Sequence, residues 1–211
     1  SENLKIGVVE GIVGLRHWIV TLEGFANHAG TTPMNRRQDA LLAASKFIIA
    51  VNEVVNSVEG NQVGTVGKMA LQPGAYNVIP GKVVLGLEIR DLSDDKIDMI
   101  LAQIEKRAAI IANESKVKII FELEANASKP ALTNKVLQQA IFNASNELGL
   151  TTKLMQSGAG HDSQEVAFIA PSAMIFIPSV GGISHSPKEF STILDITNGT
   201  NVLLKTILAI D

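Results

Sequence analysis

The order of strand and helix patterns over residues 14–124 constrains the fold more than any other feature. Strands are indicated where apolar and polar residues alternate, and helices where apolar residues recur every three or four positions. The patterns read strand, helix, strand, strand, helix, strand, at residues 17–24, 39–60, 62–71, 82–90, 93–111 and 117–123. This βαββαβ order predicts a ferredoxin-like sandwich, one open sheet with two helices on one face. Its uncovered edges favour self-association.

A second region follows the polar, proline-ended connector at residues 125–130. It is expected to contain helices and strands in alternation, the clearer ones at residues 133–148, 151–155, 173–177 and 191–208. This region is α/β in character but holds only two or three strands. We therefore predict that it is one part of a larger sheet.

The composition is that of an ordinary soluble protein, with 46% hydrophobic and 18% charged residues and a net charge of -3. It argues against a nucleic-acid-binding surface. Because the sequence has no cysteine, disulfides and thiolate metal sites are excluded, and any metal must be held by His, Asp or Glu. Polar residues interrupt the apolar stretch at 40–55, and no signal-peptide pattern is present. We expect a cytoplasmic protein without a membrane span.

Four loops combine glycine and other small residues with a side chain that can do chemistry. They carry His28, Asn77 with Arg90 on the following strand, His161 with Asp162, and His185. The loop of His185 follows the apolar strand at 173–177, at the carboxyl end where α/β sheets bind ligands. Its imidazole is a candidate metal ligand or general base. Neither Ser157 nor Ser184 lies in a Gly-x-Ser-x-Gly elbow, which disfavours a serine hydrolase.

Each of these residues also has a purely structural interpretation. His28 fits a turn histidine that bonds to backbone, and Asn77, before Val-Ile-Pro, fits a turn former. Arg90 fits an ion pair with Glu88 or Asp91. His161 and Asp162 suit a catalytic dyad poorly, because adjacent residues of an extended segment face opposite ways. The Ser-Gly-Ala-Gly run is a weak candidate for an anion-binding nest.

Four motifs together carry a resemblance to a known family. They are Asn-His-Ala-Gly-Thr-Thr-Pro-Met, Asn-Val-Ile-Pro-Gly followed by Ile-Arg-Asp, Ser-Gly-Ala-Gly-His-Asp-Ser-Gln, and Ile-Phe-Ile-Pro-Ser-x-x-Gly-Ile-Ser-His-Ser-Pro. In this order and spacing they resemble the metal-dependent amidohydrolase branch of the M20 peptidase family. That branch contains N-carbamoyl-L-amino-acid hydrolases, allantoate amidohydrolases and β-ureidopropionases.

The resemblance implies a domain organisation and a cofactor. In that family a ferredoxin-like lid, which also dimerises, is inserted into a catalytic α/β domain that holds two divalent metals, zinc or manganese. By this resemblance residues 1–13 lead from the catalytic domain into the lid, residues 14–124 form the lid, and residues 125–211 form the last part of the catalytic domain. The family's other metal ligands lie upstream of the lid, so the chain resembles the carboxyl-terminal half of an enzyme.

The resemblance also assigns roles to individual residues. His185 matches a metal ligand, and His28 would polarise the scissile carbonyl and stabilise the oxyanion in the neighbouring subunit's site. Asn77 and Arg90 would hold the substrate carboxylate. The remaining positions would contact substrate: Gly158, Ala159 and Gly160 through backbone, Gln164 as part of the pocket lining, and His17.

The function implied is metal-dependent hydrolysis of a linear C–N bond in an N-carbamoyl-L-amino acid or an allantoate-like substrate. The expected partners are a small carboxylated ureido compound and a second copy of the chain, bound through the lid, with no nucleic acid and no membrane. Two alternatives stay open: a dipeptidase or aminoacylase of the same family, and a non-catalytic dimerisation module.

Overall fold

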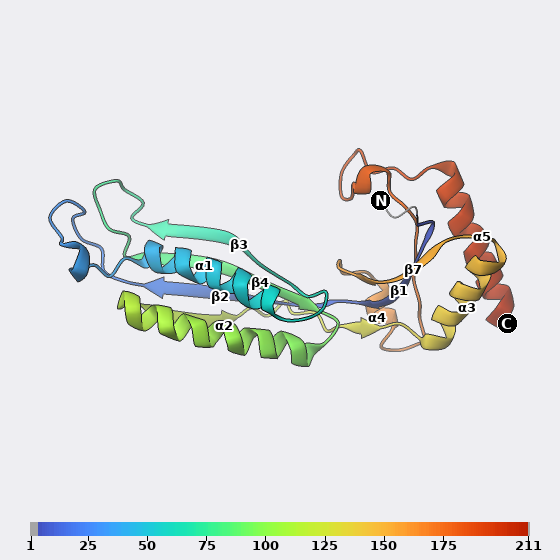
Figure 1. The fold of residues 1–211 in the computed structure, drawn as a ribbon, viewed down its shortest axis with the longest axis horizontal. Helices are drawn as coiled ribbons and strands as arrows, with labels where there is room; N and C mark the ends of the chain where they lie inside the picture. Colours follow the sequence, from blue (N-terminus) through green and yellow to red (C-terminus); the bar gives the residue numbers. More distant parts are fainter. Residues whose placement is uncertain (1–3, 211) are drawn as a thin grey trace. The chain divides into compact units, whose positions relative to one another are not determined.

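The computed structural model describes residues 4–210, and the chain divides into two compact units (Figure 1). Unit 1 comprises Ser1–Val13 and Pro130–Asp211, and unit 2 comprises Gly14–Lys129. Each unit has its own sheet and its own hydrophobic core. The mixed α/β class predicted from the sequence is confirmed at this level, with two separate sheets.

Unit 2 is a four-stranded sheet with two long helices. Its elements are β2 (Gly14–Glu23), α1 (Ala40–Ser57), β3 (Val63–Gln72), β4 (Lys82–Asp91), α2 (Asp94–Ser115) and β5 (Lys118–Leu123). The strand order is β3-β4-β2-β5, and every neighbouring pair is antiparallel. Buried residues of α1 and α2 form one cluster with those of β2 and β4, so both helices cover the same face of the sheet (Figure 1).

Polar side chains determine where the two helices begin. The carboxylate of Asp39 accepts hydrogen bonds from the backbone N–H groups of Leu41 and Leu42, at 2.9 and 3.0 Å. The hydroxyl of Ser93 accepts one from the backbone N–H of Lys96 at 3.3 Å. These bonds satisfy donors that the first turn of a helix leaves unpaired. The helix starts predicted from the sequence are therefore present.

Strand β4 separates a buried face from an open face of the sheet. The residues that face the helices are at most 1% exposed: Val83, Leu85, Leu87 and Ile89. Glu88 and Arg90 alternate with them and are half-buried on the other face. His17 of β2 lies directly opposite Glu88 in the ladder. Alternation along the strand thus decides which polar side chains the open face carries.

The sheet of unit 1 is built around β1 (Ile6–Ile12), to which the sequence analysis assigned no strand. It pairs with β7 (Thr152–Ser157) in parallel, and with β6 (Ala131–Leu132) and β8 (Ile175–Phe176) antiparallel. Gly7 leaves room in β1 for its neighbours, because a Cβ there would lie 2.5 Å from Met155 Sδ and 3.1 Å from Phe176 Cβ, so that the flexible Met155 side chain would have to move. The helices of this unit are α3 (Lys135–Glu147), α4 (Ser163–Val166) and α5 (Ile193–Ile210).

Helix α5 leaves much of its apolar surface exposed. Eight large side chains are about half exposed or more: Ile193, Leu194, Ile196, Leu203, Leu204, Ile207, Leu208 and Ile210. By length and composition alone, α1 and α5 are each apolar enough to cross a membrane. α1 contributes buried residues to the core of unit 2, whereas the exposed surface of α5 is of the kind that contacts other polypeptide.

The core of unit 2 yields a stability prediction. Phe47 is fully buried in α1, and its ring meets that of Phe121 edge-on at a centroid distance of 5.8 Å. We expect Phe47→Ala to lower the free energy of unfolding by about 3–5 kcal/mol, through lost burial and a cavity. Urea unfolding followed by fluorescence reports this unit, because the single tryptophan, Trp18, lies in the same core.

Leu42→Ala is the matched control, since Leu42 lies on the same helix but is 54% exposed. It should change the free energy of unfolding by less than about 0.5 kcal/mol. Equal effects of the two substitutions would contradict the packing described for α1.

Candidate functional site

The open face of unit 2 carries a chain of three hydrogen-bonded side chains near one end of β4. Arg90 donates from Nε to Glu88 Oε1 at 2.7 Å and from Nη2 to Glu88 Oε2 at 3.0 Å. From the neighbouring strand, His17 Nε2 lies 2.6 Å from the same Oε2. The ion pair of Arg90 with Glu88, one of the structural alternatives considered from the sequence, is present.

Charge pairing shifts the pKa of both partners. Hydrogen bonds from Arg90 lower the pKa of Glu88, burial opposes this shift, and His17 adds to the lowering. The hydrogen bonds to Glu88 raise the pKa of Arg90 against the effect of burial. At neutral pH the open face therefore carries a guanidinium whose Nε and Nη2 are held by the carboxylate of Glu88, a charge-assisted two-point pair.

The loops of His28 and Asn77 lie side by side at the other end of this sheet. The backbone of His28 bridges to Val78, and the N–H of Ala29 donates to the carbonyl of Asn77 at 2.9 Å. The His28 and Asn77 residues are both exposed. The structure thus brings together His28 and Asn77, which the sequence analysis had given separate roles.

Arg90 is far from this pair within unit 2. β4 begins at Lys82, shortly after the Asn77 loop, and Arg90 is its ninth residue. At about 3.4 Å per residue, roughly 27 Å of strand separates Lys82 from Arg90. Asn77 and Arg90 of one chain therefore do not meet at one carboxylate, although the resemblance assigns both to it.

Arg37, which sequence reasoning missed, bonds to the loop that carries the candidate residue His28. Its guanidinium donates from Nη2 to the carbonyl of Ala29 at 2.5 Å and from Nε to the carbonyl of Thr32 at 3.1 Å. Both carbonyls belong to the loop that carries His28. An arginine just beyond a glycine-containing motif was the only sequence signal, and it does not say which carbonyls the side chain reaches.

In unit 1 the loop Gly158, Ala159 and Gly160 follows β7. The hydroxyl of Ser157 donates to the carbonyl of Ala159 at 2.8 Å, and a Cβ built at Gly158 meets nothing within 4 Å. The backbone at Gly158 is therefore open to approach. Gln164 was expected to line a pocket, but it is 4% exposed and donates from Nε2 to the carbonyl of Val13 at 3.2 Å.

His185 lies exposed in the loop between η2 (Val180–Gly182) and α5. Its backbone is left-handed, with φ 53°, and its N–H donates to Glu189 Oε2 at 2.8 Å. A residue other than glycine in this region is uncommon and is held there by its surroundings. The imidazole is presented on a loop that is fixed by side-chain and backbone bonds.

The metal-binding capacity of the described residues is limited. Within residues 4–210, no three His, Asp or Glu side chains cluster closely enough to hold a metal ion. His161, the other histidine of unit 1, accepts a hydrogen bond at Nδ1 from the N–H of Ser163 at 3.0 Å. Since a zinc site generally needs about three protein ligands, this donor set does not fit a two-metal centre.

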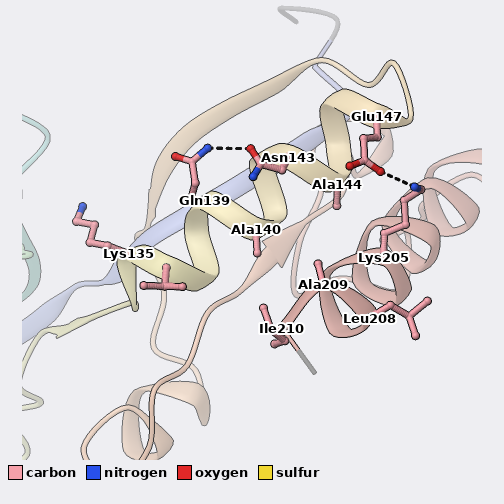
Figure 2. Close-up of a pocket in the computed structure, with 11 residues that line it drawn as sticks. Lys135, Gln139, Ala140, Asn143, Ala144, Glu147, Lys205, Leu208, Ala209 and Ile210 are labelled. Carbon is pink, nitrogen blue, oxygen red and sulfur yellow. Dashed lines mark hydrogen bonds and ion pairs between the residues drawn. The ribbon is translucent and has the colours of Figure 1, made fainter.

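Two hollows differ in their chemistry. One of about 680 Å³ lies between α3 and α5 in unit 1, where Lys205 pairs with Glu147 at 2.6 Å (Figure 2). Its lining is mainly apolar, and of the described residues it includes none that the resemblance assigns. The other, of about 280 Å³, lies on the open face of unit 2 beside His17 and Glu88. The second hollow coincides with part of the predicted site.

Comparison with known proteins identifies relatives over nearly the whole chain. The profile of Peptidase family M20/M25/M40 matches residues 5–209. The chain is 40% identical to an N-carbamoyl-L-amino acid amidohydrolase of Geobacillus stearothermophilus, covering 98% of this chain and 50% of that protein. It is also 40% identical to a ureidoglycolate hydrolase of Arabidopsis thaliana, covering 98% of this chain and 44% of that protein.

A solved structure resembles this one closely. The crystal structure of an amidase of the hydantoinase/carbamoylase family from Burkholderia multivorans matches with a TM-score of 0.92 and 36% identity. The match covers 99% of this chain and 50% of that one. The chain thus spans about half the length of the relatives that it matches.

The pKa shift of Glu88 predicts a pH-dependent contribution to stability. The pKa of Glu88 is lowered in the folded state. Glu88 therefore stabilises the fold at pH values above the ordinary pKa range of a glutamate, and this contribution is lost as the pH falls through the pKa of the folded state. We expect Glu88→Gln to be less stable than the parent at about pH 7, and the difference to narrow as the pH falls below about 4.

The measurement is urea unfolding at a series of pH values, followed by the fluorescence of Trp18. Glu53→Gln is the control, because Glu53 is exposed and pairs with Arg107 on the helical side. A deficit of Glu88→Gln that stayed constant down to low pH would show that charge is not its cause.

Proposed function

Since the chain belongs to peptidase family M20/M25/M40, in its hydantoinase/carbamoylase branch, we propose that the complete protein hydrolyses a linear C–N bond. The substrate class is a small carboxylated ureido or amide compound, of the N-carbamoyl-L-amino acid or allantoate type. The single observation that carries the proposal in the structure is Arg90, a half-buried guanidinium on an open sheet face, which Glu88 orients through two hydrogen bonds.

Arg90 binds the substrate carboxylate in this proposal. Hydrogen bonds between two ionised groups are roughly twice as strong as neutral ones, and a planar guanidinium matches both carboxylate oxygens. The hollow beside His17 and Glu88 on the same face leaves room for the rest of a small substrate. His17 then lies where it can contact that substrate from the neighbouring strand.

His28 and Asn77 act at the scissile carbonyl. An oxyanion that develops during hydrolysis is stabilised by donors aimed at it in advance, and His28 and Asn77 offer an imidazole and an amide on adjacent exposed loops. Because β4 keeps them far from Arg90 of the same chain, we assign them to the site of a second copy. In this proposal unit 2 is a ferredoxin-like lid that also forms the dimer.

A divalent metal, zinc or manganese, would supply an acidified water as the nucleophile when bound in the complete protein. His185 is the one residue of this chain that we assign to it. A single imidazole does not hold two metals, so the remaining ligands belong to parts of the protein outside these residues. Arg90, His28 and Asn77 supply the substrate-binding and oxyanion-binding parts of the reaction.

Replacing Arg90 tests the proposed function directly. In the complete enzyme we expect Arg90→Ala to raise KM for N-carbamoyl amino acids strongly, because the substrate carboxylate would lose hydrogen bonds from a charged group, which contribute about 1.5–3 kcal/mol each. Ammonia release measures the rate. Arg107→Ala removes the same charge from the exposed face of α2 and should leave KM unchanged. Unchanged kinetics of Arg90→Ala would overturn the assignment.

Mixing two impaired variants, assayed at a substrate concentration where each alone has little activity, tests whether the site is shared between copies. If His28 acts in the partner's site, a dimer of His28→Ala with Arg90→Ala has one intact site, and an equal mixture should recover roughly a quarter of the parent activity. If both residues act within one chain, every site carries a defect. No recovery, with subunit exchange verified by mass spectrometry, would place His28 and Arg90 in the same chain's site.

A further inference from the structure

We propose that Arg37 is a positioning residue that holds the imidazole of His28 in one neutral tautomer, with its proton on Nε2. Nδ1, the ring nitrogen nearer the backbone, accepts hydrogen bonds from the loop itself. His28 Nδ1 accepts hydrogen bonds from the backbone N–H groups of Gly30 at 2.9 Å and Thr31 at 3.3 Å. A nitrogen whose lone pair faces two donors does not carry a proton. The neutral ring therefore keeps its proton on Nε2.

The guanidinium of Arg37 acts on the same peptide units. A peptide bond is planar and trans, so the C=O of one residue and the N–H of the next point in opposite directions. The carbonyl of Ala29 accepts from Arg37 Nη2 at 2.5 Å, and the N–H of Gly30, in the same plane, donates to His28. Arg37 thus fixes the peptide plane whose N–H group selects the tautomer.

Two further hydrogen bonds hold the loop that carries His28. Arg37 Nε donates to the carbonyl of Thr32 at 3.1 Å, and the hydroxyl of Thr32 donates to the carbonyl of His28 at 2.7 Å. The planar fork of a guanidinium reaches both carbonyls at once, which the single ammonium of a lysine does less well. The side chain of Arg37 thus links the carbonyls of Ala29 and Thr32, at the two ends of the turn.

Glycine at position 30 lets the ring approach the backbone. A Cβ there would lie 3.1 Å from His28 Cε1 and 3.4 Å from Nδ1, closer than ordinary van der Waals contact. This is independent of Arg37 and supports the same ring position. The functional meaning rests on the proposed function: a histidine that donates from Nε2 to a developing oxyanion needs this tautomer before substrate arrives.

The test that does not depend on activity is ¹⁵N NMR of the imidazole nitrogens in this 211-residue chain, at about pH 8, above the ordinary range of histidine. His28→Gln assigns the signals. In the parent chain we expect Nδ1 of His28 to have the shift of an unprotonated nitrogen and Nε2 that of a protonated one. A proton on Nδ1, or a mixture of tautomers, would overturn the proposal whether or not any variant folds.

Arg37→Ala should convert the single tautomer to a mixture, and Arg37→Lys should give an intermediate spectrum. Arg36→Ala is the matched control, because Arg36 is adjacent to Arg37 and exposed. Within residues 4–210, its side chain makes no hydrogen bond or ion pair. An unchanged Trp18 fluorescence spectrum verifies that the core is intact. A parent-like tautomer in Arg37→Ala would overturn the positioning role.

Kinetics of the complete enzyme separate this inference from the proposed function. Arg37→Ala should lower kcat about tenfold to a hundredfold with little change in KM, since small misplacements of a catalytic group have effects of this size, whereas Arg90→Ala acts mainly on KM. A tautomer lost in Arg37→Ala with kcat unchanged would overturn the oxyanion role given to His28, while the tautomer assignment would stand.

Discussion

Burial of one face of β4 against α1 and α2 is the constraint on which unit 2 depends. Leu85 and Leu87 lie in the centre of the core, and because successive side chains of a strand point to opposite faces, Glu88 and Arg90 are directed to the open face. A shift of one residue in register would bury Arg90 and expose the apolar set, which makes the register strongly specified. The carboxylate-binding geometry is thus fixed by the same alternation that forms the core.

The same strand acts as a spacer between two groups of site residues. Arg90 with Glu88 and His17 lies at one end, and His28 with Asn77 lies beyond the other. The strand is held in a four-stranded ladder with helices on its buried face, so it does not bend enough to bring these ends together. Under the proposed function, self-association is therefore part of the catalytic arrangement, because it brings His28 and Asn77 of one copy to the Arg90 of the other.

Unit 1 contributes residues held on loops that follow strands. Gly158 follows β7, and His185 lies in the segment after β8. Because β7 is parallel to β1 and β8 is antiparallel to it, the carboxyl ends of these two strands lie at opposite edges of the sheet. The bond from the N–H of His185 to Glu189 holds the left-handed backbone at this position. The other three strands of this unit, β6, β7 and β8, all pair with β1. The sheet therefore depends on β1, a short strand that is distant in sequence from the other three.

Local sequence was sufficient for the elements whose signals are local. Helix α1 follows from Asp39 and an apolar stripe, and β4 from strict alternation, because caps and periodicity act over a few residues. The order of four motifs was sufficient for the family. Tertiary structure alone decided that residues 6–12 form the central strand of unit 1, since that short apolar run acquires its role by pairing with β7, far along the chain. It also decided that Asn77 accompanies His28, that His17 of the neighbouring strand joins the pair of Arg90 and Glu88, and that Arg37 reaches the His28 loop. Each of these depends on the directions of side chains and peptide planes after the chain has folded back on itself, which no local pattern encodes.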